Sequence, residues 1–234
     1  GGYHDELLAE IAAGTTRIGI AFGEAIKRRN NAGVTVKDGR MSGTSMYAFD
    51  AEANAYLVAD QHQHIYLVRA DDPGLKRSHL ATVDKTRRTV ELNYDNVTAD
   101  LVSDDASVFT ATVDIGRMAL AADTLGAAQN MLDQAVEYAK QREQFNRPIG
   151  SFQAVKHMCA EMAAQLEPCR SMVWFAGHAL AELPEESRIT ACHTKAHLAE
   201  VGQFIAKTST EVHGGMGFTD LVGLHYWFLS LIHI

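Results

Sequence analysis

The chain has 234 residues, of which 47% are hydrophobic, a content that predicts one or two globular domains and excludes a disordered protein. A formal net charge of -8, a pI of about 5.7 and the lack of long Lys/Arg runs exclude the basic surface of a nucleic-acid binder. No apolar run approaches the roughly 20 residues of a membrane helix and the N-terminus lacks a secretion signal, so we expect a cytoplasmic protein without a membrane partner.

A strand-like alternation of apolar and polar residues runs from Val34 to about Val97. The clusters KDGR, DAEAN and DDPG interrupt it, as turns between strands do. The pattern predicts a small antiparallel β domain.

The period changes after the β domain. From Val113 to Ala139, and again from Val155 to Leu180, apolar residues recur at steps of three and four, which predicts two amphipathic helices. Pro184 and two glutamates open a third helix, which is expected to run to about Val212, where HGGMG ends it. Three long helices with short connections predict an antiparallel bundle.

The two ends of the chain carry no signal of natural termini. The first residue is not Met, and WFLSLIHI stops inside an apolar segment without a helix cap. LSLIHI also matches the translated sequence of an adaptor used in sequencing libraries. We therefore expect a fragment in which residues 229–234 are not native, and we assign no function to His233.

The turn REQFNRPIGSFQ, residues 142–153, carries chemistry that suits a dinucleotide. A guanidinium such as that of Arg142 or Arg147 can hold a phosphate with two hydrogen bonds, and Phe145 can stack on a planar ring. Gln153 can donate to a further phosphate oxygen or to a ribose. A solvated turn whose arginines cover helix ends explains the same composition.

Paired glycines in EVHGGMGF, residues 211–218, follow the third helix. They let the backbone turn sharply and expose N–H groups to an anion. A glycine helix cap is an equally good interpretation of this segment.

Other candidate ligands carry weaker signals. His193 and His197 lie four residues apart with Glu200 on the same helical face, as in some metal sites. No Glu lies between the two histidines in HTKAH and no second ligand helix is apparent, so we expect a polar helix face and no metal site. The three cysteines are odd in number and form no CxxC motif, which predicts reduced thiols.

Taken together on this helix order, the arginine and glycine motifs resemble the acyl-CoA dehydrogenase family over essentially the whole chain. The strongest matches are residues 116–162, from GRMALAADT to KHMCAEM, and VHGGMGF at residues 212–218. The patterns TRR at residues 86–88 and YDNV at residues 94–97 look most like actinobacterial-type members that act on bulky acyl-CoAs.

The resemblance implies an α+β fold in two domains. After a missing N-terminal helical domain come a small antiparallel, β-barrel-like middle domain, residues 1–105, and an antiparallel helical bundle, residues 106–234. FAD is expected between the two domains and across a subunit interface.

The resemblance also implies roles for particular residues. Arg142, Gln144 and Phe145 match the element that reaches the FAD of the neighbouring subunit, and Gln153 matches a Gln on the same cofactor. Residues 211–215 match the segment around the FAD pyrophosphate and adenosine. The implied cofactor-binding residues are Arg142, Gln144, Phe145, Gln153, Glu211, Val212, His213, Gly214 and Gly215.

Asp114 and Arg117 match positions at the acyl-CoA site of the family. The family's reaction removes the α-proton of an acyl thioester with a Glu while the β-hydrogen leaves as hydride to flavin N5, giving a trans-2-enoyl-CoA. In most members this base follows the glycine motif, beyond residue 234 here, and in a subgroup it stands at the position of Gly116, which is not a base. The catalytic residue is therefore unknown.

Two segments of the β domain depart from the family pattern. The flavin-side loop, usually Thr-Glu-Pro followed by Gly-rich sequence, reads FGEAIKRRNN at residues 22–31. The usual Trp and Thr that contact the flavin are replaced by Tyr47 and Phe49. The resemblance thus implies weakened flavin-side contacts beside intact pyrophosphate contacts from the bundle.

Three functions fit these observations. The first is an FAD-dependent acyl-CoA dehydrogenase that acts on an acyl-CoA, passes electrons to an electron-transfer flavoprotein or similar acceptor, and forms homo- or hetero-oligomers. The alternative is a non-catalytic subunit that completes the FAD site of a sister subunit. A flavin monooxygenase or nitroalkane-oxidase-like relative on the same fold is the third.

Overall fold

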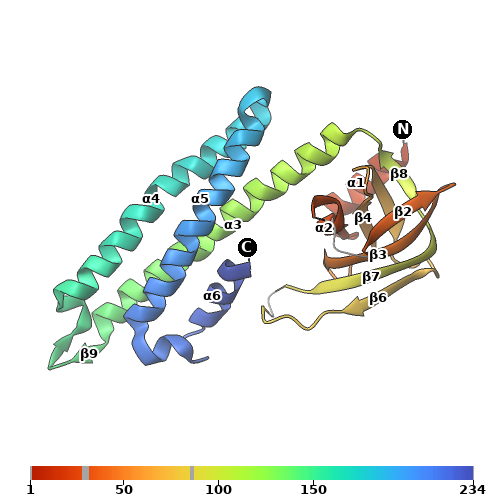
Figure 1. Ribbon diagram of the computed structural model, residues 1–234. Coiled ribbons are helices and arrows are strands. Elements are labelled where there is room, and N and C mark those ends of the chain that lie inside the picture. The colour runs from red at the N-terminus through yellow and green to blue at the C-terminus, as the bar shows by residue number, and fades with distance from the viewer. Residues whose placement is uncertain (1, 28–31, 85–86, 234) are drawn as a thin grey trace. The chain divides into compact units, whose positions relative to one another are not determined.

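The computed structural model describes residues 2–27, 32–84 and 87–233, and the chain divides into two compact units, residues 1–110 and 111–234 (Figure 1). The first unit is built around a β-sheet, and the second consists mainly of helices. This arrangement confirms the predicted α+β class. No helix in the described ranges is long and apolar enough to cross a membrane.

An eight-stranded sheet forms the first unit, in the order β6-β7-β3-β1-β4-β5-β8, with β2 paired to β3. Six of the seven strand pairings among the described residues of this sheet are antiparallel, as predicted, whereas β1 pairs parallel with β4, with Ile18 opposite Ala55. The bounds are β1 (Ile18–Ala21), β2 (Gly33–Lys37), β3 (Arg40–Phe49), β4 (Ala55–Ala59), β5 (Ile65–Arg69), β6 (Leu75–His79), β7 (Thr89–Thr98) and β8 (Asp100–Ser103).

The predicted barrel-like, wholly antiparallel domain therefore needs two corrections. Within the described strands the sheet is an open path that ends at β6 and β8, so it is not a closed barrel. The parallel pair arises because α2 (Gly23–Ile26), β2 and β3 lie between β1 and β4 in the chain, long enough for a crossover connection.

Alternating side chains build the core of this unit. Along β7, Val90, Leu92 and Tyr94 are buried while the residues between them are partly exposed. The Tyr94 hydroxyl donates to Ser45 Oγ at 3.3 Å, and burial raises the pKa of Tyr94 well above its ordinary value. β4 and β5 are apolar on both faces, as expected for central strands.

Four elements of the first unit lie outside the predicted strand-like stretch. They are α1 (Gly2–Ala12), β1, α2 and β8, of which the last three are only four residues long. The loop predicted at residues 22–31 begins with Phe22 and α2, whereas residues 28–31 lie outside the described part of the chain. Thr86 of the TRR pattern also lies outside it.

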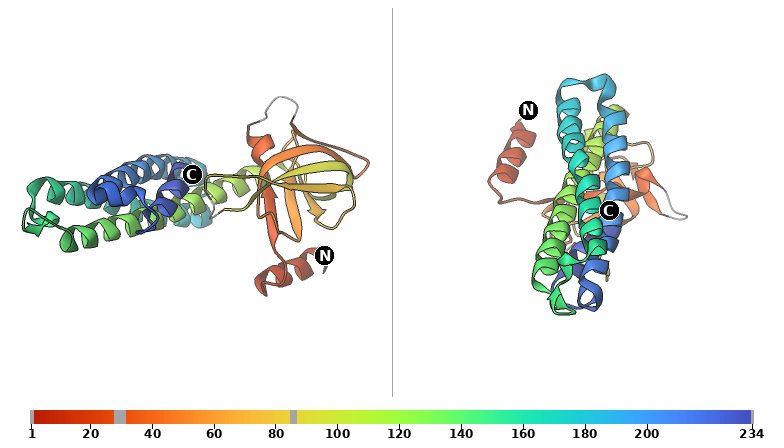
Figure 2. Two further views of the ribbon diagram at one scale, coloured as in Figure 1. Left: turned by 90° about the horizontal axis from the view of Figure 1, so that it is seen from below. Right: turned by 90° about the vertical axis from the view of Figure 1, so that its left-hand side faces the viewer.

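Three long helices form the second unit and confirm the predicted bundle (Figure 2). The first of them begins seven residues before the predicted start, because the Asp105 carboxylate accepts the Ser107 N–H at 2.8 Å and caps the helix. A fourth helix, α6, was not predicted. The bounds are α3 (Ala106–Gln141), α4 (Gln153–Glu182), α5 (Pro184–His213) and α6 (Leu224–His233).

Small and large side chains interlock in the bundle core. A Cβ added to Gly202 on α5 would lie 2.7 Å from Thr124 Cγ2 on α3, so the glycine makes room for its neighbour. Met131, Leu166 and Ile205 fill the space around them and are fully or almost fully buried. All three cysteines are free thiols.

Gly43 on β3 provides a test of the sheet geometry. Its φ angle is 132°, and a Cβ there would lie 2.2 Å from the Gly33 carbonyl oxygen, whereas Gly39, with φ 71°, has open space around it. Gly43→Ala should lower the free energy of unfolding by about 3 kcal/mol and Gly39→Ala by about 1 kcal/mol. Chemical denaturation followed by circular dichroism measures both, and equal losses would contradict the geometry.

Candidate functional site

The connection between α3 and α4 is a small β-hairpin. Its strands, β9 (Glu143–Gln144) and β10 (Arg147–Pro148), pair antiparallel with Arg147 opposite Gln144. Phe145 and Asn146 form the tip, with φ angles of 54° and 60°. Two successive positive φ angles are typical of a type I′ turn, which is strained for Phe. The chain accepts this strain and holds the Phe145 ring in solvent, 87% exposed.

The base of the hairpin is fixed to the last turn of α3. Arg142 N–H donates to the Tyr138 carbonyl at 2.8 Å, and Ile149 N–H donates to the Arg142 carbonyl at 2.7 Å. A short 3-10 helix, η1 (Ile149–Ser151), follows, and a Cβ on its Gly150 would lie 2.9 Å from the Ala139 carbonyl oxygen. The backbone of Arg142 is thus held from both sides.

The polar side chains of the hairpin differ in what they contact. The Arg147 guanidinium lies 4.0 Å from the centroid of the Phe152 ring, a cation–π contact, and Phe152 meets Phe145 edge to face at 6.1 Å. Gln153 Nε2 lies 2.6 Å from His157 Nε2. The Arg142 side chain is exposed and makes no hydrogen bond or ion pair with any described residue, so it can receive an anion.

The glycine segment at the end of α5 exposes backbone. Gly214 has a φ of 58°, and its N–H donates to the Glu211 carbonyl, which ends the helix. The 3-10 helix η2 (Gly214–Phe218) follows. Gly214, Gly215 and Glu211 are exposed, whereas the side chains of Val212 and His213 are buried, at 5% and 4% exposure. A ligand at this surface would meet Glu211 and the glycine backbone.

The hairpin and the glycine segment lie at the same end of the bundle (Figure 1). The His213 ring stacks on the Tyr138 ring with centroids 4.6 Å apart and planes 28° apart. Tyr138 is one helical turn before Arg142. The structure therefore brings together the two predicted cofactor-binding segments from distant parts of the sequence.

Asp114 and Arg117 lie near the other end of α3. The Asp114 carboxylate is buried and is paired with the Arg117 guanidinium, whose side chain is 31% exposed. A depression of about 460 Å³ lies beside Asp114, between the start of α3, the end of α4 and the start of α5. Arg117 and Arg142 are separated by 25 residues of helix, or about 37 Å. One small ligand cannot contact both.

Gly116, at the position where a subgroup of the resembled family carries its catalytic base, has open space around it. A Cβ added to Gly116 would meet nothing within 4 Å. In the described residues, no group of three or more His, Cys, Asp or Glu side chains is arranged to hold a metal ion. The predicted face of His193 and His197 on α5 is exposed.

Tyr47 and Phe49, the two replaced flavin-side positions, are both exposed on β3. Tyr47 has a positive φ of 54° and lies in an irregular stretch where the β3–β7 register shifts between Ser45 and Ala48. Phe49 is opposite Ile20 of β1, which is also exposed. These three side chains present an apolar surface.

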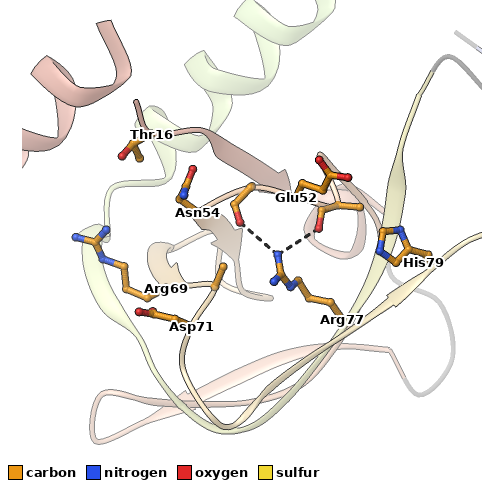
Figure 3. A pocket seen from close by; sticks show the side chains of 10 residues that line it. Thr16, Glu52, Asn54, Arg69, Asp71, Arg77 and His79 are labelled. Atoms are coloured by element: carbon orange, nitrogen blue, oxygen red, sulfur yellow. Dashed lines mark hydrogen bonds between the residues drawn. The ribbon is translucent and has the colours of Figure 1, made fainter. Parts of the chain in front are cut away.

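A depression of about 790 Å³ in the first unit was missed by sequence reasoning (Figure 3). Arg77 reaches into it and donates to the carbonyls of Ala51 and Ala53 at 3.2 and 3.4 Å. The DAEAN cluster, which forms part of its wall, predicts only a turn in the sequence. Because its lining mixes two arginines with two carboxylates, it has no single preferred ligand charge. Its charged and polar side chains are Thr16, Glu52, Asn54, Arg69, Asp71, Arg77 and His79.

The Asp114–Arg117 pair can be tested through stability. Arg117→Met should lower the free energy of unfolding by about 2 kcal/mol, because it leaves a buried carboxylate without its cation. The double variant Asp114→Asn/Arg117→Met should recover about 1 kcal/mol, since no buried charge remains. Urea denaturation followed by tryptophan fluorescence reports this unit, because Trp174 and Trp227 both belong to it. No recovery in the double variant would refute the pairing.

Several known proteins have a similar sequence or a similar fold. FadE27, an acyl-CoA dehydrogenase of Mycobacterium tuberculosis, is 32% identical over 205 residues, which cover 82% of this chain and 54% of FadE27. A variant of the Tcur3481-Tcur3483 steroid ACAD has a TM-score of 0.87 and 28% identity, and the match covers 100% of this chain and 66% of that one. The ChsE4-ChsE5 complex from Mycobacterium tuberculosis matches with a TM-score of 0.81 and 26% identity, over 95% of this chain and 62% of that one.

The chain spans about half the length, or less, of the curated relatives that it matches. CarC, a subunit of the caffeyl-CoA reductase-Etf complex of Acetobacterium woodii, is 36% identical over 107 residues, which are 46% of this chain and 28% of CarC. The family model described as "Acyl-CoA dehydrogenase, C-terminal domain" matches residues 106–231, more than half of the chain. With its fold, its motifs and this match in agreement, the chain belongs to the acyl-CoA dehydrogenase family.

Proposed function

We propose that the chain is part of an FAD-dependent acyl-CoA dehydrogenase that oxidises an acyl-CoA to the trans-2-enoyl-CoA. The observation that carries this proposal is the meeting of two segments at one end of the bundle. One offers an exposed arginine and an exposed aromatic ring, Arg142 and Phe145, and the other offers the exposed backbone of Gly214 and Gly215. An arginine and backbone N–H groups bind phosphate, and an aromatic ring stacks on a planar base.

The residues present fit a dinucleotide such as FAD. Arg142 has no partner among the described residues and would bind pyrophosphate oxygens. The Phe145 ring, held out at the hairpin tip, would stack on a planar ring. Gln144 and Gln153 are exposed amides that would donate to phosphate or ribose oxygens. FAD, when bound, supplies the hydride acceptor at flavin N5.

Arg117 is the residue that we propose to act at the acyl-CoA. Its guanidinium is oriented by the buried Asp114 carboxylate, so it needs little rearrangement to face negative charge. Removal of the α-proton puts such charge on the thioester oxygen, and a fixed cation nearby would stabilise it. Gly116 beside it has no side chain, so the base that takes the proton is not at that position.

The distance along α3 supports an oligomer. Arg117 lies on α3 and Arg142 follows its last residue, about 37 Å further along, which is too far for a single dinucleotide and its substrate. We infer that each group serves a different active site and that two copies, or two related chains, must assemble. An electron-transfer flavoprotein or similar acceptor would then take the electrons.

The alternative function is a non-catalytic subunit that completes the FAD site of a sister subunit. Three features favour it: Gly116 is not a base, and Tyr47 and Phe49 present an exposed apolar surface where the family has Trp and Thr. The ChsE4-ChsE5 complex, in which the matched chain has this fold, offers a parallel for assembly from two named components.

Arg142→Gln tests the cofactor role. In the intact protein we expect the FAD dissociation constant to rise about tenfold to a hundredfold, because a charge-assisted hydrogen bond to phosphate is lost. Arg188→Gln is the matched control, since Arg188 is also an exposed arginine of the bundle without a partner among the described residues. Titration by flavin fluorescence measures both, and equal affinities for the two variants would refute the role of Arg142.

Purification of the intact protein, alone and together with the product of the neighbouring gene, separates the two functions. Bound flavin and acyl-CoA oxidation by the protein alone are the expected result for the dehydrogenase. Flavin binding and activity only in the two-chain mixture would instead support the non-catalytic subunit.

A further inference from the structure

We propose that His213 is a positioning residue that couples the two cofactor-holding segments to each other. The inference rests on the proposed function and concerns the same site. The His213 side chain is 4% exposed, so it does not itself face a ligand. Its ring instead joins the end of α5 to the end of α3 through Tyr138.

On the α5 side, His213 is fixed to its own helix. Its Nδ1 lies 2.7 Å from the Ser209 carbonyl oxygen, and because a carbonyl only accepts, Nδ1 must carry the proton. The glycine segment then wraps closely around it. A Cβ added to Gly217 would lie 2.8 Å from the Thr210 carbonyl oxygen and 3.2 Å from His213 Cβ. The glycine backbone at Gly217 thus packs directly against the last turn of α5, which carries His213.

On the α3 side, Tyr138 is part of the anchor of the hairpin. Its ring stacks on His213 at 4.6 Å, and its carbonyl accepts the Arg142 N–H at 2.8 Å. Gly150 packs against the carbonyl of the next residue, Ala139. The same turn of helix thus carries the stack on one side and the hairpin on the other.

The consequence is that one aromatic stack sets the spacing between Arg142 and the exposed backbone of Gly214 and Gly215. A dinucleotide that contacts both segments at once needs that spacing to be fixed before it binds, because ordering the segments during binding would cost affinity. The stack would provide this order through the buried side chain of His213.

The test is a double-mutant cycle on FAD affinity in the intact protein. His213→Ala and Tyr138→Leu should each raise the FAD dissociation constant about tenfold, as expected for the loss of one aromatic pair with its ordering effect. The double variant should be no weaker than either single variant within about twofold, because each change alone breaks the link. Tyr138→Phe, which keeps the ring, should retain FAD affinity.

A second measurement does not need the cofactor. Without FAD, His213→Ala should speed amide hydrogen exchange in residues 142–150 as well as in residues 211–217, although the substitution lies in only one of the two segments. Leu198→Ala is the control for general destabilisation, because Leu198 is fully buried on the same helix and far from His213. It should lower stability while leaving FAD affinity and the relative exchange of residues 142–150 unchanged.

The outcomes separate this inference from the proposed function. Additive losses in the double variant, or a loss of FAD affinity in Leu198→Ala equal to that in His213→Ala, would overturn the coupling role alone. An intact wild-type protein that binds no FAD would overturn the proposed function, and the inference with it.

Discussion

Helix α3 is the element on which the rest of the functional arrangement depends. It runs without a break for 36 residues, or about 54 Å, carries Asp114 and Arg117 near one end and Tyr138 near the other, and is followed directly by Arg142. A continuous helix transmits position because each of its turns is fixed by the next. The distance along α3 between the two groups of candidate residues is therefore set by the regular rise of the hydrogen-bonded helix.

The packing around α3 explains how such a long helix stays in place. The buried α3 residues of the bundle's hydrophobic core are five alanines together with Met131 and Leu132, so the neighbours of α3 can come near it. Thr124 fits against Gly202 of α5, where any side chain would collide. Small residues on α3 and larger ones on α4 and α5 give a core that resists sliding of one helix along another. That resistance keeps the stack of His213 on Tyr138 in register.

Much of this architecture could be predicted from the sequence, and the failures have physical causes. The predicted second and third helices, residues 155–180 and 184–212, differ from α4 and α5 by two residues or fewer at each end, because their apolar period is long and Pro184 marks the boundary between them. Four-residue elements such as β1 and α2 carry too few positions for a period to emerge. The parallel pairing of β1 with β4 is a tertiary choice that no local pattern encodes.

The candidate site shows a similar division. Residue types alone drew attention to the α3–α4 turn and to the glycine segment, but not to the form of either. The hairpin has Phe-Asn at its tip in place of the Asn-Gly that would signal a type I′ turn, so its strained geometry was invisible. His213 was grouped with its exposed neighbours because a motif does not reveal burial. The depression around Arg77 was missed since its lining comes from several strands and loops.

The buried polar side chains at the bundle end near His213, like its geometry, are consistent with a binding site there. Thr208, Ser209, Thr210 and His213 are all buried there, in a region where apolar side chains would pack at lower cost. Three of them are satisfied by carbonyls of the preceding turn: Ser209 and Thr210 donate to the Ala206 carbonyl at 3.2 and 2.8 Å, and His213 donates to that of Ser209. Bonds of this kind hold a helix end in a definite shape and leave its outer backbone uncovered. These buried polar side chains and the strained backbone of Phe145 lie where the two ligand-holding segments meet. Both features cost stability, and such costs are typical of binding sites.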